Sequence, residues 1–216
     1  MNTGQEGGAH QADRQAKLLP VLALADPEAG IAQLCEAFGF KDLGQGRVGY
    51  GDLTVLVSDG AEGLSGFLPL RMDHLALKVP DLGPVLAQMP TKFSRVTPEG
   101  PREIEEFWET GVRYVFFDAP EDWPLEFCTL RGGGGRAHGL DHFGLRVATL
   151  APFEATLESM GAVCVARHQL GAVNVSFLRR AGQVFELFDE PPVEGARTVA
   201  DGDLPLRGWC GFVPED

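Results

Sequence analysis

The chain has 216 residues, of which 44% are hydrophobic and 23% charged, and this suits one sizeable globular domain or two small ones. Its formal net charge of −13 argues against a nucleic-acid or anionic-membrane partner, because either would require a basic surface. No stretch approaches the roughly 18 apolar residues of a membrane span, and residues 1–17 lack the apolar core of a signal peptide. We therefore expect a cytoplasmic protein with a flexible N-terminal tail.

The first ordered segment, residues 18–58, predicts a strand, a helix and two further strands. The opening strand covers residues 18–25. The helix begins at Asp26 as N-cap, has Pro27 in its first turn and ends at Gly39. Two strands follow at residues 47–50 and 53–57, and a short strand is expected near residues 67–70.

Two longer segments follow, and each predicts a strand, a helix and more strands. In residues 71–130 we expect a helix over 81–89 and strands over 93–96, 114–117 and 125–130, with 97–111 as an inserted loop or short helix at the rim. In residues 139–190 we expect a helix over 151–160 and strands over 163–166, 173–178 and 184–188. The Gly-rich residues 131–138 form a flexible linker. Residues 191–216 form a tail that packs on the body through Trp209 and Phe212.

The strands that open these two segments carry one repeated sequence. Asp-His-Leu-Ala-Leu-Lys-Val at residues 73–79 returns as Asp-His-Phe-Gly-Leu-Arg-Val at residues 141–147. Because side chains alternate between the two faces of a strand, the histidine, the small residue and the basic residue share one face in each copy. The remaining apolar side chains face the core.

The last strand of each segment also contains a matching residue. Pro-Leu-Glu-Phe-Cys at residues 124–128 and Val-Phe-Glu-Leu-Phe at residues 184–188 each place one glutamate in an apolar run. A carboxylate in such a strand needs a partner or water, because burying it unpaired is costly. His74, Glu126, His142 and Glu186 therefore indicate one site made by two copies of one unit.

The arrangement resembles the vicinal oxygen chelate superfamily, the group of glyoxalases, bleomycin-resistance proteins and extradiol dioxygenases. The resemblance rests on residues 73–79, 114–127, 141–147 and 185–188, and it covers about residues 18–190. It implies an α+β fold in which repeated βαβββ units pair into a cupped mixed sheet. The units would be residues 18–70, 71–130 and 139–190.

The resemblance also implies a metal site. Ligands in this superfamily come from the first and last strands of each unit, which here gives His74, Glu126, His142 and Glu186. Imidazole and carboxylate groups together suit a divalent ion such as Zn, Ni, Fe or Mn. The set resembles that of metal-dependent glyoxalase I; methylmalonyl-CoA epimerases are similar but usually have Gln at one carboxylate position. It implies a lyase or isomerase that acts on a small substrate with vicinal oxygens through an enediolate-like intermediate, with Glu126 or Glu186 as base.

Other residues are candidates for substrate contacts. Lys78 and Arg146 share the histidine faces and could meet a carboxylate or phosphate, or they lie at solvent-facing strand ends. His168 could line the cavity mouth. Two alternatives stay open: an Fe(II) extradiol dioxygenase that uses two histidines and one glutamate, with His168 or Tyr114 as acid or base, and a metal-free, drug-sequestering binding protein.

The first unit departs from the pattern. Leu19 stands where the other units have histidine, and no glutamate matches in residues 53–58. The second and third units could therefore complete the site within one chain. Alternatively, the first and second units pair, and the third meets its copy in a homodimer. The ligand pattern favours the former. We expect the first unit to pack against the rest of the chain or against its copy in a dimer and to contribute no ligand, and we expect the protein to be a homodimer.

The cysteines, Cys35, Cys128, Cys164 and Cys210, are far apart and form no CxxC pair. In a chain without a secretion signal we expect free thiols rather than a disulfide framework.

Overall fold

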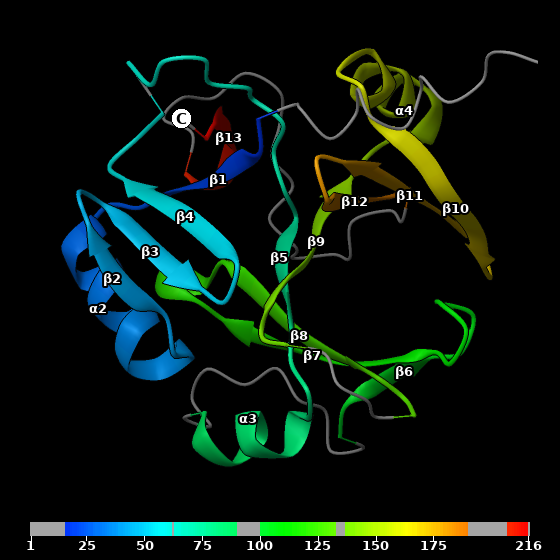
Figure 1. Ribbon diagram of the computed structural model, residues 1–216, viewed down its shortest axis with the longest axis horizontal. Helices are drawn as coiled ribbons and strands as arrows, with labels where there is room; N and C mark the ends of the chain where they lie inside the picture. The colour runs from blue at the N-terminus through cyan, green and yellow to red at the C-terminus, as the bar shows by residue number, and fades with distance from the viewer. Residues whose placement is uncertain (1–15, 62, 90–99, 133–136, 190–206, 216) are drawn as a thin grey trace, which may run out of the picture.

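The computed structural model describes residues 16–61, 63–89, 100–132, 137–189 and 207–215. These residues form two sheets, one of five strands in the order β13-β1-β4-β3-β2 and one of eight strands in the order β10-β11-β12-β9-β5-β8-β7-β6 (Figure 1). The strand predicted at 93–96 and nearly all of the N-terminal tail lie outside the described residues. No helix of the described part of the chain is long and apolar enough to cross a membrane.

The five-stranded sheet contains the first unit and the end of the chain. Its elements are β1 (Leu18–Ala23), α2 (Pro27–Phe38), β2 (Lys41–Gly44), β3 (Arg47–Tyr50), β4 (Leu53–Ser58) and β13 (Gly208–Pro214). The predicted ends of α2 are confirmed. The Asp26 side chain accepts a hydrogen bond from the Ala29 N–H at 3.0 Å, and Gly39 adopts the left-handed φ of 74° that suits glycine.

The eight-stranded sheet is built from two similar halves. The first half has β5 (His74–Lys78), α3 (Leu82–Gln88), β6 (Arg102–Ile104), β7 (Val112–Asp118), η2 (Pro120–Asp122) and β8 (Pro124–Leu130). The second half has β9 (Gly139–Arg146), α4 (Leu150–Ser159), β10 (Val163–Leu170), β11 (Val173–Arg180) and β12 (Gln183–Phe188). In each half the first and last strands pair in parallel, and antiparallel pairing of β5 with β9 joins the halves. The predicted α+β fold with paired units in a curled mixed sheet is confirmed.

The main core lies between the two sheets. Aromatic contacts cross it: Tyr50 meets Phe127 with ring centroids 6.1 Å apart, and Phe143 meets Phe212 at 4.9 Å. Each fully buried side chain of this size stabilises the fold by about 1.5–3 kcal/mol. Because the eight-stranded sheet uses this face for the core, its opposite face, which bears the histidines, is left for the site. We call it the histidine face.

The other face of the five-stranded sheet is filled by apolar side chains. Leu19 lies there, 4% exposed, in a cluster with the connection that follows β4, through Leu64 and Phe67. The Leu68 N–H donates to Phe212 O at 2.8 Å and fixes this connection to β13. In this unit, the face that corresponds to the histidine face is therefore covered by the connection that follows β4.

The C-terminal strand β13 covers the edge of the first unit. It pairs antiparallel with β1, as β9 pairs with β5 in the larger sheet. Trp209 and Phe212 are 1% and 0% exposed, and the Trp209 Nε1–H donates to Pro124 O at 2.9 Å. The first unit thus pairs with the C-terminal strand of the same chain, whereas the second and third units pair with each other.

Candidate metal centre

The histidine face presents two equivalent rows of side chains. Hydrogen-bonded register places Phe116, Glu126, Ala76 and His142 side by side across β7, β8, β5 and β9. It places Phe177, Glu186, Gly144 and His74 side by side across β11, β12, β9 and β5. Each row ends with a histidine of one copy beside the small residue and the glutamate of the other copy. The small residues of the repeated sequence thus lie opposite the histidines of the partner copy.

The four predicted ligands converge through their side-chain tips. His74 Nε2 lies 3.1 Å from His142 Nε2, 3.3 Å from Glu126 Oε2 and 3.6 Å from Glu186 Oε2. His142 Nε2 lies 3.1 Å from Glu186 Oε2. All four residues are buried, with exposed fractions between 4% and 8%.

These separations fit ligands of one ion. Donor atoms bound at about 2.0–2.2 Å to a common metal lie about 2.8–3.1 Å apart in octahedral geometry and about 3.3–3.6 Å apart in tetrahedral geometry. His74, His142 and Glu186 form a group of donors that could hold a metal ion. Two unprotonated imidazole nitrogens facing each other at this distance would repel, so a cation between them, a proton or a metal, relieves the repulsion. The donor set suits a divalent first-row ion.

Glu126 lies beside this group and differs from Glu186 in its electrostatics. Burial raises the pKa of Glu126 to about 7, although the nearby His142 and His74 act in the opposite direction. For Glu186, burial is outweighed by the charge and the hydrogen bond of His142, and its pKa falls below the usual value. Two chemically identical side chains thus differ in proton affinity, which is the condition for giving them different roles.

The surroundings of His142 increase its affinity for a proton. Burial alone would lower its pKa, but the charge of Glu186 and the hydrogen bonds to Asp141 and Glu186 raise the pKa of His142 well above its ordinary value. In the absence of a metal, a proton on this imidazole balances the buried carboxylate.

The aspartates of the repeated sequence were missed as functional residues, although they precede both histidines. Asp73 Oδ2 lies 3.1 Å from His74 Nδ1, and Asp141 Oδ2 lies 2.9 Å from His142 Nδ1. Each carboxylate therefore accepts a hydrogen bond from the ring nitrogen that points away from the site. The signal was present in the repeat itself, because both copies begin with Asp-His.

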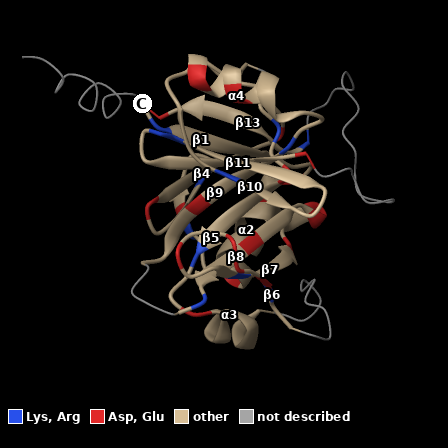
Figure 2. Ribbon diagram, turned by 90° about the vertical axis from the view of Figure 1, so that its right-hand side faces the viewer, with Lys and Arg blue, Asp and Glu red and all other residues tan. Residues whose placement is uncertain are grey.

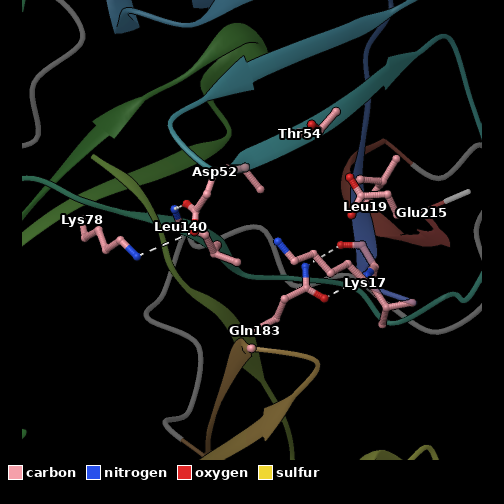
Figure 3. A pocket seen from close by; sticks show the side chains of 11 residues that line it. Lys17, Leu19, Asp52, Thr54, Lys78, Leu140, Gln183 and Glu215 are labelled. Carbon is pink, nitrogen blue, oxygen red and sulfur yellow. Dashed lines mark hydrogen bonds and ion pairs between the residues drawn. The ribbon is translucent and has the colours of Figure 1, made fainter. Parts of the chain in front are cut away.

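The predicted substrate-contacting residues lie in three different surroundings. Arg146 Nε donates to Asp73 Oδ1 at 2.9 Å, at the edge of the ligand group. Lys78 Nζ instead lies 3.9 Å from Asp52 Oδ2, where the two sheets meet. There it lines a cavity of about 210 Å³ together with Lys17, Gln183 and Glu215 (Figure 3).

The third predicted contact, His168, lies within an aromatic cluster. Its ring is 5.1 Å from Phe107 and 5.9 Å from Phe177, and Trp108 lies 5.2 Å from Phe177. Phe107 and Trp108 belong to the segment predicted as a rim loop, and they reach across to β11 of the other half. Both aromatic residues thus contact Phe177, the register neighbour of Glu186.

Basic residues occur on several of the described elements. In the view of Figure 2, Lys and Arg are scattered over separate strands and are not gathered into one patch. Several arginines are held in ion pairs, such as Arg131 with Glu103 and Glu105.

Comparisons with known proteins identify the fold. No family model matches the sequence, and no curated protein is similar to it. Among solved structures, glyoxalase I from Zea mays is 18% identical with a TM-score of 0.59, over 83% of this chain and 69% of that one. A mutant of the same enzyme gives 17% and 0.58 over the same shares. A putative dioxygenase from Bacillus subtilis is 16% identical with a TM-score of 0.46, over 82% of this chain and 64% of that one.

At this level of identity the likeness to glyoxalase I is a likeness of fold. It confirms the predicted fold, in which paired units form a curled mixed sheet as in glyoxalase I.

Proposed function

We propose that this protein binds one divalent metal ion through His74, His142 and Glu186, and that it is a lyase or isomerase of the glyoxalase or epimerase type. The observation that carries the proposal is the convergence of donor atoms 3.1–3.6 Å apart from two repeat-equivalent strand pairs. The substrate would be a small molecule with vicinal oxygens. All of these donors belong to one chain, so a homodimer, if it forms, would carry two independent sites.

The bound ion would act as a Lewis acid toward the oxygens of the substrate, which makes the neighbouring C–H more acidic. The proton transfer falls to Glu126. Its pKa of about 7 suits a group that accepts and returns a proton at neutral pH. Glu186, hydrogen-bonded to His142 and held ionised, suits the role of ligand. Phe188 and Phe177, which are buried beside His74 and His142, would limit the access of water.

One observation favours a second function. His74, His142 and Glu186 alone make the two-histidine, one-carboxylate set found in non-haem Fe(II) oxygenases. An extradiol dioxygenase would use these ligands and a separate acid or base, such as Tyr114. Burial and the nearby Glu126 raise the pKa of Tyr114. The lyase or isomerase would need Glu126 as a base, whereas the dioxygenase would not.

The experiment begins with metal analysis of protein purified without a histidine tag. The metal-loaded protein is then tested on 2-oxoaldehyde hemithioacetals, acyl-CoAs and catechols, with solvent deuterium incorporation and O₂ consumption followed in parallel. For a lyase or isomerase we expect deuterium incorporation without O₂ uptake. Glu126→Gln should lower the rate of exchange at least about 100-fold while metal is retained. Glu154→Gln, on α4 where the carboxylate pairs with Arg167, is the matched control and should change neither. O₂ uptake with a catechol would support the dioxygenase instead, and a protein that binds no metal would contradict both functions.

A further inference from the structure

Contacts link Asp73, Arg146 and Phe188 on the side of the His74 ring that faces away from the other candidate ligands. Asp73 bonds His74 Nδ1, Phe188 lies against the face of the ring with ring centroids 5.9 Å apart, and Arg146 contacts both Asp73 and Phe188. We infer that Asp73 and Arg146 are positioning residues that fix the tautomer and the orientation of His74 for metal binding. The inference rests on the proposed metal site, but its second test below does not need the metal.

The tautomer follows from the hydrogen bond to Asp73. Because Asp73 Oδ2 accepts at 3.1 Å from Nδ1, the neutral ring carries its proton on Nδ1. The lone pair is then on Nε2, the atom that faces His142 and Glu186. An imidazole ligand with a carboxylate behind it is both oriented and more basic. Asp73 thus determines which ring nitrogen is offered to the metal.

Arg146 keeps this carboxylate in place. Its Nε donates to the other oxygen, Asp73 Oδ1, at 2.9 Å, and its guanidinium carbon lies 4.8 Å from the centroid of Phe188. Phe188 is the register neighbour of Arg146 across β12 and β9. A planar guanidinium can stack on the ring and hold the carboxylate at once, which an ammonium group cannot do as well.

The contact between Arg146 and Asp73 links the two copies of the repeat. Arg146 follows His142 on β9, whereas Asp73 lies immediately before β5 and His74 is the first residue of β5. The position of one ligand is therefore fixed by the strand that carries the other. The equivalent basic residue of the first copy, Lys78, lies instead near Asp52 of the first unit, so the two copies use this position differently.

The first test measures metal affinity in the absence of substrate, by calorimetric titration of the metal-free protein with Zn²⁺. Asp73→Asn should weaken binding by about 10–100-fold, the range seen when such carboxylate partners are removed. Arg146→Gln should weaken it several-fold, and Arg146→Lys should recover only part of the loss. Arg167→Gln removes the same charge from a surface pair with Glu154 and should leave affinity unchanged. Arg146 variants with wild-type metal affinity but weaker substrate binding would overturn the inference and make Arg146 a substrate contact.

The second test reads the tautomer directly in the metal-free protein at alkaline pH. Long-range ¹H–¹⁵N spectra should show His74 protonated on Nδ1 in the wild type and a mixture of tautomers in Asp73→Asn. Circular dichroism checks that the variants are folded. A wild-type His74 protonated mainly on Nε2 would overturn the inference even if the protein binds metal. A wild type that binds no Zn²⁺ would overturn the proposed function alone, and the tautomer would still decide the role of Asp73.

Discussion

Gly144 lies directly across the β5–β9 pair from His74, and the imidazole occupies the space that a side chain at position 144 would need. A Cβ built on Gly144 would lie 2.1 Å from His74 Cε1 and 2.3 Å from Nε2. Glycine is needed at position 144 because the His74 ring occupies the space of any larger side chain.

Gly144→Ala should displace the His74 ring and weaken metal binding by at least about 10-fold, a loss of about 1.4 kcal/mol or more in binding free energy. Gly60→Ala is the control, because nothing lies within 4 Å of a Cβ at that position. The measurement is metal affinity by calorimetry, with the unfolding temperature as a check on the fold. Wild-type affinity in Gly144→Ala would mean that His74 is not a ligand in the position described.

Metal affinity should rise with pH. The pKa of His142 is raised well above its ordinary value by Glu186 and Asp141, so near neutral pH its imidazole carries a proton that must leave before a metal binds. Calorimetric titrations at pH 6, 7 and 8, in buffers of different ionisation enthalpy, should show proton release on metal binding and an affinity that increases with pH. Affinity that does not change with pH would contradict the assignment of His142 as a ligand.

Alkaline conditions should weaken the junction between the two sheets. Burial raises the pKa of Tyr50 to about 12, whereas in the unfolded chain tyrosine ionises near pH 10. Between these values the unfolded state loses its proton first, so the free energy of unfolding falls as pH rises from about 10 to about 12 and is unaffected below that range. Denaturant unfolding across this window should show the decline, and Tyr50→Phe should show a shallower one. Equal slopes in both proteins would assign the effect to other groups.

The sequence predicted which side chains share a face better than it predicted the strand partners. The histidines and the two glutamates lie on strands in which polar and apolar side chains alternate. This alternation allowed His74, Glu126, His142 and Glu186 to be placed on one face. The pairing of β13 with β1 joins residues almost 200 positions apart and leaves no local pattern, so it could not be predicted. β2, which has no buried side chain, was missed because it lacks an apolar face.

The positions of the basic residues show another limit. Lys78 and Arg146 are equivalent in the repeat, and the sequence predicted the same position for both, either in contact with the substrate or at a solvent-facing strand end. Their different surroundings depend on which surface packs nearby: the turn carrying Asp52 reaches Lys78, whereas Arg146 meets Asp73 and Phe188. The roles of Asp73 and Asp141 required the distance to the Nδ1 atoms, which spacing alone cannot give.

The strand β13 should be essential to stability. Phe212 is 0% exposed and meets Phe143 and Phe185, so Phe212→Ala should lower the free energy of unfolding by about 3–5 kcal/mol. Phe153→Ala, at a side chain 37% exposed on α4, should cost much less. Denaturant unfolding of both variants makes the comparison, and similar losses would argue against a buried β13.

The central claim, that the two copies of the repeat hold one metal ion between them, is tested most directly by counting metal in tag-free wild-type protein and in His142→Ala. His168→Ala is the control, because its ring lies beside Phe107 and Phe177 rather than in the ligand group. Elemental analysis after reconstitution and gel filtration should give one ion per chain in the wild type and in His168→Ala. In His142→Ala it should give a small fraction of one. Full metal content in His142→Ala, or none in the wild type, would contradict the claim.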